Sequence, residues 1–350
     1  MSWVELEHSK KQVRRSGDYL ITQQDKFDID TVIASFDTLS NWRSSHAYPM
    51  QSMIGYIRKK AFEIDHKAII AQRLKRTPSI LSKLKREKGM KLDRMEDIAG
   101  CRVVVSNNVA VYAVRNSIVT GRTRNILRRE RDYIKSPKDS GYLGIHLIYK
   151  YNGAKKSFSG HSVELQIRSK TQHSWATAVE VVGTFTGQAL KASKGRDSWL
   201  NFFKLASIAF SDVENRKISK NAETKDRIEF HKYIDRLGVV DRLRAFAVST
   251  QHLGKYPKNR GDYFLLKLDI EKSNINISGY TSENLSQATD EYAKLETEFK
   301  DDTTKDVVLV SASSINGLKK AYPNYFADTT EFMKTVDKLI EANKKIQRTV

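Results

Sequence analysis

Four short segments with polar or charged residues at regular spacing constrain this chain more than any other feature. In chain order they read RLKRTPSILSKLKRE (73–87), MEDIAGCRVVV (95–105), RDYIKSPKDSGYLGIHLIYKY (131–151) and VELQIRSKTQHSWA (163–176). The first predicts a helix, and the β-branched runs in the other three predict strands. Their polar side chains fall on common faces, so we expect an α/β fold, a mixed sheet flanked by helices, that turns these faces toward one site.

The remaining pattern predicts two domains, residues 1–228 and 229–350. Residues 1–70 are predicted to be mostly helical, because apolar residues recur at three- and four-residue spacing in 30–42 and 50–62. The polar stretch 214–230 contains no helix breaker and predicts a helix leading into the second domain. There we expect an α+β pattern, with strands at 242–250, 263–270, 274–281 and 306–312 and helices at 286–299, 314–326 and 329–345.

Composition excludes several classes of protein. A hydrophobic content of 39% and a charged content of 29% suit a folded domain rather than a disordered chain. No apolar run approaches the roughly 20 residues that span a bilayer, and residues 1–16 lack the apolar stretch of a signal peptide. We therefore expect a cytoplasmic protein with no membrane partner. The single cysteine, Cys101, excludes an internal disulfide and a multi-cysteine zinc site, and is expected in the core.

The formal net charge of +20 is unevenly distributed. Residues 1–225 carry +19 and residues 226–350 carry +1. A basic region of this size predicts binding of a polyanion, whether nucleotide, RNA or both, and a merely solvated basic surface is the alternative. The segment GRTRNILRRERDYIK (121–135) is especially rich in arginine.

Cations line one face of the helix predicted in the first segment. Ser79, Lys83 and Arg86 are spaced i, i+4 and i+7, and Arg73 and Lys75 lie just upstream. Such a row suits a triphosphate, although a solvated basic helix face has the same pattern.

Two carboxylates lie just before or within predicted strands. Asp97 precedes the strand that contains Cys101, and Glu164 shares one strand face with Gln166 and Arg168. Either carboxylate could bind Mg²⁺, and Glu164 could also act as a general base. A surface ion pair of Glu164 with Arg102 or Arg168 is the alternative.

The turn KSPKDSGYLGIH presents a cation, an aromatic ring and an imidazole. Lys138, Tyr142 and His146 could meet a nucleobase, with Tyr142 stacking on it. A half-buried loop tyrosine and a core histidine are the alternatives. His161 and His173 have no metal-ligand spacing and are predicted to be structural.

These four segments, in this order, resemble the synthetase domain of RelA/SpoT enzymes over roughly residues 45–190. The resemblance implies a nucleotidyltransferase-like core that moves the β,γ-pyrophosphate of ATP to a ribose 3′-hydroxyl and leaves AMP. It implies the following roles by position. The ATP site would comprise Arg73, Lys75, Ser79, Lys83, Arg86, Arg102 and Arg131. The catalytic and Mg²⁺-binding carboxylates would be Asp97 and Glu164, and the acceptor site would comprise Lys138, Tyr142, His146 and Gln166.

The chain departs from alarmone synthetases immediately after Tyr142. Those enzymes read Gly-Tyr-Arg/Gln-Ser-x-His, whereas this chain has Leu143 and Gly144 in place of the polar pair. The departure counts against GDP or GTP as the acceptor.

The second region resembles the C-terminal part of CapRel-type fused toxin–antitoxins. That resemblance implies a zinc-finger-like domain without zinc, which blocks the ATP site through a Tyr-x-x-Tyr element and senses a phage structural (capsid) protein. Tyr322 and Tyr325 match the element, although two aromatics packing a helix corner would have the same spacing. The resemblance implies transfer to the 3′-CCA end of tRNA, which would stop translation in anti-phage defence. A small alarmone synthetase and a catalytically inert RNA-binding module are the alternatives.

Overall fold

The computed structural model describes residues 3–22, 28–188, 190–215, 225–243, 263–269, 274–299, 305–311, 315–326 and 328–347. Its strands are β1 (Ile69–Leu74), β2 (Ala99–Val105), β3 (Ile126–Asp132), β4 (Ile145–Lys150), β5 (Ser162–Ser169), β6 (Tyr263–Asp269), β7 (Asn274–Tyr280) and β8 (Lys305–Ser311). Its helices are α1 (Lys10–Ile21), α2 (Ile29–Ser44), α3 (Ala47–Ile64), α4 (Thr77–Arg86), α5 (Asn108–Thr120), α6 (Lys170–Phe185), α7 (Asp197–Glu214), α8 (Lys225–Leu237), α10 (Leu285–Glu298), α11 (Ile315–Ala321) and α12 (Thr330–Gln347). Short 3₁₀ turns lie at 92–94, 156–158, 190–192, 282–284 and 323–326.

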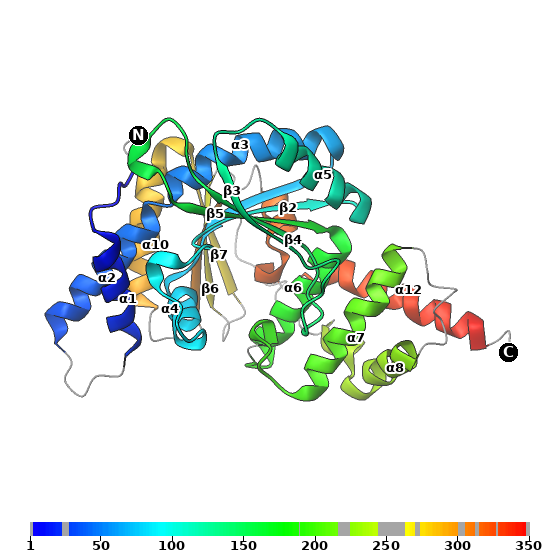
Figure 1. Ribbon diagram of the computed structural model, residues 1–350. Coiled ribbons are helices and arrows are strands. Elements are labelled where there is room, and N and C mark those ends of the chain that lie inside the picture. The colour runs from blue at the N-terminus through cyan, green and yellow to red at the C-terminus, as the bar shows by residue number, and fades with distance from the viewer. Residues whose placement is uncertain are drawn as a thin grey trace.

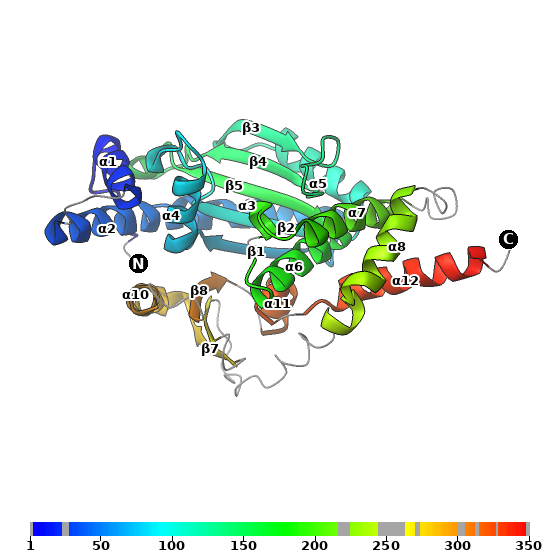
Figure 2. The same ribbon diagram turned by 90° about the horizontal axis from the view of Figure 1, so that it is seen from below.

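One mixed sheet runs through the molecule in the order β3-β4-β5-β2-β1-β8-β6-β7 (Figure 1). β2 and β5 are parallel, and every other neighbouring pair is antiparallel. The three C-terminal strands join the sheet where Ser311 of β8 pairs with Gln72 of β1. Seen from below, β7 and β8 lie beyond β1, with α10 beside them (Figure 2).

Strand alternation gives the central sheet one apolar and one polar face. Val163, Leu165 and Ile167 of β5 are fully buried against α3 and α5, which cover the apolar face. Glu164 and Gln166 therefore point to the opposite face, as the sequence predicted. Cys101 is buried in the same core, as predicted.

A second core joins helices from distant parts of the sequence. Trp175 of α6 and Phe202 of α7 pack with Phe230 of α8, and Phe332 of α12 completes the cluster. α12, at residues 330–347, therefore shares its core with helices of the first 240 residues. The division at residues 228 and 229 stays a prediction.

The α/β class, the mixed sheet with N-terminal helices and the additional C-terminal α+β region are confirmed. The zinc-finger likeness of the last region stays a prediction. In the described ranges, no helix has the length and apolar character needed to cross a membrane.

Two local predictions differ from the structure. The helix predicted over 214–230 is interrupted in the structure: α7 ends at Glu214 with Asn215 as its cap, residues 216–224 lie outside the described residues, and 225–230 are helical as predicted, within α8. Asn competes with helical hydrogen bonding and favours such ends. The strand predicted over 242–250 is helical at 242–243, and its remainder lies outside the described residues.

Candidate active site

A cleft of about 1380 Å³ opens on the polar face of the sheet, between α4 and α6. Every residue predicted for the ATP, acceptor and metal sites lines it, together with Tyr322. These residues are Arg73, Lys75, Ser79, Lys83, Arg86, Asp97, Arg102, Arg131, Lys138, Tyr142, His146, Glu164 and Gln166.

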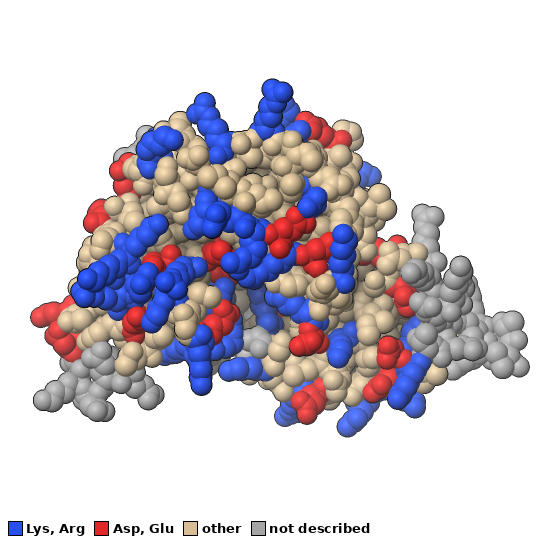
Figure 3. Space-filling view, viewed as in Figure 1, with Lys and Arg blue, Asp and Glu red and all other residues tan. Residues whose placement is uncertain are grey.

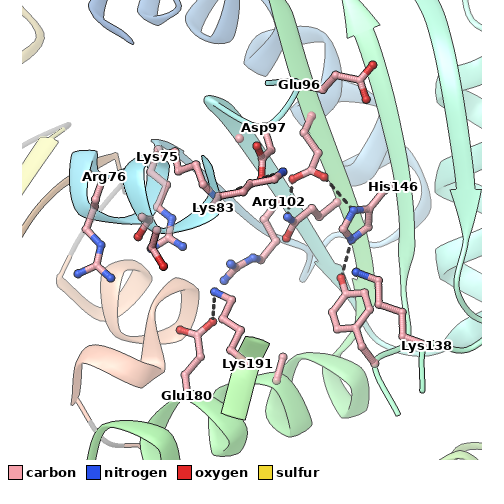
Figure 4. Close-up of a pocket in the computed structure, with 18 of the residues that line it drawn as sticks. Lys75, Arg76, Lys83, Glu96, Asp97, Arg102, Lys138, His146, Glu180 and Lys191 are labelled. Atoms are coloured by element: carbon pink, nitrogen blue, oxygen red, sulfur yellow. Dashed lines mark hydrogen bonds and ion pairs between the residues drawn. The ribbon is translucent and has the colours of Figure 1, made fainter. Parts of the chain in front are cut away.

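The cation row lies on α4 and on the strand that leads into it. Ile80 and Leu84 of α4 are buried, so Ser79, Lys83 and Arg86 face the cleft. Nζ of Lys83 lies 3.0 Å from Oδ2 of Asp97, and Nζ of Lys75 lies 3.1 Å from the same oxygen. Two ammonium groups thus converge on one carboxylate (Figure 4).

The second carboxylate belongs to a polar network on β4 and β5. Oε1 of Glu164 lies 2.9 Å from Nδ1 of His146, and Nε2 of Gln166 donates to Oε2 at 2.7 Å. A carboxylate can only accept, so Nδ1 of His146 carries a proton. Burial raises the pKa of Glu164, but attraction to His146 and the two hydrogen bonds outweigh it and lower the pKa to about 2.

Tyr142 completes this network on the side of His146 away from Glu164. Its hydroxyl lies 2.6 Å from Nε2 of His146 and accepts a 3.0 Å hydrogen bond from Nε of Arg168. The guanidinium of Arg168 and the ammonium of Lys138 lie 4.9 and 5.1 Å from the centre of its ring. Hydrogen bonds therefore connect Tyr142 to His146 and His146 to Glu164. Neither a half-buried loop tyrosine nor an isolated core histidine, the two alternatives, would have these contacts.

The two carboxylates fit a magnesium ion bound together with substrate phosphates. Asp97 lies two residues before β2, and Glu164 of β5 pairs with Gly100 of β2, so both lie toward the same end of neighbouring strands. Oδ1 of Asp97 is buried, and in the described part of the chain it has no hydrogen-bond partner. No group of three or more His, Cys, Asp or Glu side chains suited to a metal occurs among the described residues. Mg²⁺ commonly uses one or two carboxylates and takes its other ligands from phosphate and water.

The sequence analysis did not identify an ion pair that lies on the wall of the cleft opposite Asp97. Oε1 of Glu180 on α6 lies 2.6 Å from Nζ of Lys191, and both line the cleft (Figure 4). The pKa of Glu180 is strongly lowered: burial raises it, but Lys191, Arg73 and Arg102 outweigh burial. The sequence offered little signal, because α6 has the apolar pattern of a core helix and Lys191 lies beyond its end.

The C-terminal region reaches this cleft through Tyr322. The Tyr322 side chain is buried, and its hydroxyl donates a 2.9 Å hydrogen bond to the carbonyl oxygen of Gln72 on β1. The guanidinium of Arg102 donates to the neighbouring carbonyl oxygen of Ala321 at 3.4 Å. Tyr325 lies in the 323–326 turn, and its side chain falls outside the described structure. His161 and His173 are buried, and His161 contacts Ser45 and Phe158, consistent with a structural role.

The mouth of the cleft is basic. Lys and Arg side chains gather on the face seen in Figure 3, around a hollow in the middle of the molecule. Exposed arginines along and before β3 contribute to the basic surface, and several cleft-lining cations follow α4. They include Arg122, Arg124, Arg128, Arg129, Arg131, Lys88 and Arg94.

Residues 72–182 match the family described as "Region found in RelA / SpoT proteins". This part of the chain is therefore similar to that family, in agreement with the RelA/SpoT resemblance read from the sequence. The CapRel type stays a prediction.

Individual relatives match parts of the chain. GTP pyrophosphokinase YjbM of Bacillus subtilis (strain 168) is 32% identical over 121 residues, which cover 33% of this chain and 57% of the relative. A GTP pyrophosphokinase of Escherichia coli (strain K12) is 26% identical over 203 residues, covering 56% and 25%. The chain thus spans a little over half of the first relative and a quarter of the second. The crystal structure of the small alarmone synthetase 1 from Bacillus subtilis bound to its product pppGpp is 26% identical and aligns over 50% of this chain and 94% of its own, with a TM-score of 0.41.

Proposed function

We propose that this chain is an ATP-dependent pyrophosphokinase that transfers the β,γ-pyrophosphate of ATP to the 3′-hydroxyl of tRNA. The observation that carries the proposal is the convergence of Lys75 and Lys83 on Asp97 in the same cleft as Glu164. In the transfer, the oxygen of the 3′-hydroxyl attacks the β-phosphorus, and the bond between this phosphorus and the oxygen that bridges it to the α-phosphorus breaks. AMP leaves with the bridging oxygen, and the hydroxyl proton passes to solvent. Such reactions depend on aligning the reactants and neutralising phosphate charge.

The residues divide between these tasks. Lys75, Lys83 and Arg86 would bind and orient the triphosphate. Asp97 and Glu164 would hold Mg²⁺, which offsets negative charge on the phosphates. With a pKa of about 2, Glu164 is a weak proton acceptor at neutral pH, which favours the role of ligand over that of general base.

The acceptor site supports an RNA substrate. Leu143 and Gly144 offer no polar side chain beside Tyr142, whereas the rim of the cleft is lined with exposed arginines such as Arg129 and Arg131. Cations along the rim of the cleft can contact the phosphate backbone of an RNA. A free nucleotide has no extended backbone and would not make these contacts.

Autoinhibition is part of this proposal. Tyr322 and the Arg102–Ala321 hydrogen bond lie in the cleft where the resemblance puts the adenine of ATP. In a closed state, the Tyr-x-x-Tyr element would occupy the ATP site and exclude ATP. A phage structural protein that binds the open state more tightly would shift the chain toward the open state and so relieve the inhibition. Normal growth of cells that express the double variant Tyr322→Ala with Tyr325→Ala would contradict autoinhibition.

A transfer assay tests the proposal. The full chain and the Tyr322→Ala/Tyr325→Ala variant receive γ-labelled ATP with Mg²⁺ and either bulk tRNA or GDP and GTP. We expect label on tRNA that is lost when the 3′-terminal adenosine is removed. Label only on guanine nucleotides would instead support a small alarmone synthetase that makes (p)ppGpp or (p)ppApp, a function that the names of the GTP pyrophosphokinase relatives favour. RNA binding without any transfer would indicate an inert RNA-binding module.

A further inference from the structure

The first turn of α4 receives its cap from a residue more than 200 positions away in the sequence. Arg76 occupies the N-cap position, and in the described structure its side chain does not cap the helix. Instead, the amide of Thr77 donates to Oε1 of Glu296 on α10 at 2.7 Å, and the Thr77 hydroxyl donates to Oε2 at 3.1 Å. The start of a helix has unsatisfied N–H donors and a partial positive charge, so a carboxylate there is favourable.

Glu296 is itself held in place by buried neighbours. The hydroxyl of Tyr292, whose side chain is buried, donates to Oε1 of Glu296 at 2.6 Å. The guanidinium of Arg43 lies 4.6 Å from the centre of the Tyr292 ring, and its Nε donates to the carbonyl oxygen of Lys75 at 2.7 Å. Hydrogen bonds of this network therefore hold the β1–α4 turn at both of its ends, at Lys75 and at Thr77.

This turn determines where the phosphate-facing cations lie. Lys75 is the first residue of the turn, and Ser79 and Lys83 follow it on the cleft side of α4. Because both lysines reach the same oxygen of Asp97, a shift or fraying of the first turn of α4 would move them relative to that carboxylate. Thr77 and Glu296 do not line the cleft, so the Glu296 carboxylate does not occupy the place of a nucleotide.

We propose that Glu296 is a positioning residue for the donor-nucleotide site. The C-terminal region would then stabilise that site through Glu296 as well as inhibit it through Tyr322. The inference rests on the proposed function, since it assumes that α4 binds ATP phosphates. It assigns opposite effects to two contacts of the same region: Tyr322 opposes nucleotide binding and Glu296 favours it.

The experiment titrates a non-hydrolysable ATP analogue with Mg²⁺ into the full chain by calorimetry. The variants are Glu296→Ala, Glu296→Gln and, as a matched control, Glu298→Ala, which alters an exposed glutamate on the same helix. The parent is the wild-type chain, or the Tyr322→Ala variant if the wild type does not bind. We expect Glu296→Ala to raise Kd about fivefold, the size expected for loss of a helix cap, Glu296→Gln to raise it less, and Glu298→Ala to leave it unchanged.

Thermal unfolding and hydrogen exchange across 77–86 accompany the titration. Faster exchange in α4 together with the weaker binding would support the proposal. A lower melting temperature with unchanged Kd would make Glu296 merely structural and overturn the proposal, and an equal effect of Glu298→Ala would do the same. If neither parent binds the analogue, the proposed function itself is wrong, and this inference falls with it.

Discussion

At the scale of single residues, Glu164 is the side chain whose surroundings most restrict its chemistry. His146 and Gln166 occupy its two oxygens and keep it ionised. We expect Glu164→Gln to lower transfer at least about 100-fold, because the charge that would hold a cation is lost while the shape is kept. The measurement is initial rate with saturating ATP, and Glu63→Gln on the far helix α3 is the control. Activity close to that of wild type would remove Glu164 from the reaction.

The same residue predicts how stability depends on pH. The ordinary pKa of a glutamate is 4.5, and in the folded chain that of Glu164 falls to about 2. The folded state therefore binds fewer protons than the unfolded state between these values, so the contribution of Glu164 is present above about pH 4.5 and disappears as the pH falls toward 2. It amounts to about 3 kcal/mol. Urea unfolding from pH 6 to 2.5 should show a steeper loss for wild type than for Glu164→Gln, and parallel curves would contradict the prediction.

At the scale of elements, the turn between β3 and β4 is shaped by Gly141. Its φ is +86°, and a Cβ there would lie 3.1 Å from Cα of Lys204 and 3.3 Å from the carbonyl oxygen of Phe203 on α7. We expect Gly141→Ala to cost about 1–3 kcal/mol of stability, because the backbone conformation and the contact are both unfavourable. Urea unfolding measures the loss. Gly55→Ala within α3, where no atom lies within 4 Å, should stabilise by up to about 1 kcal/mol.

Sequence patterns identified the apolar strands of the sheet better than the strands that mix apolar and charged residues. β2, β4 and β5 were predicted because their β-branched runs are buried on one or both faces. β1 and β3 were missed because each mixes its apolar residues with Arg or Gln; β3 is an exposed edge strand, where charged side chains prevent unwanted pairing. Glu296 could not be found from the sequence, since the cap it provides is a tertiary contact.

At the scale of the whole molecule, the core shared by α6, α7, α8 and α12 joins the C-terminal helix to helices from the middle of the chain. Phe332 is fully buried there and packs against Phe202 and Phe210. We expect Phe332→Ala to lower the free energy of unfolding by about 3–5 kcal/mol, with Lys338→Ala, an exposed change on the same helix, close to neutral. Chemical denaturation followed by fluorescence would measure both. A separate early transition that leaves the main one unchanged would mean that the last region folds independently.

The position of β1 in the sheet has a consequence for the chain as it is synthesised. In the finished protein β1 is an interior strand between β2 and β8, but β8 is more than 200 residues further along the chain. Residues 72–182 leave the ribosome before residue 305 is made, and at roughly 5–20 residues per second this interval lasts on the order of 6 to 25 seconds. During that time β1 is a free edge, and the cleft lacks Tyr322. Under the autoinhibition proposed above, every newly made molecule would pass through an uninhibited stage, whose duration is set by the speed of translation.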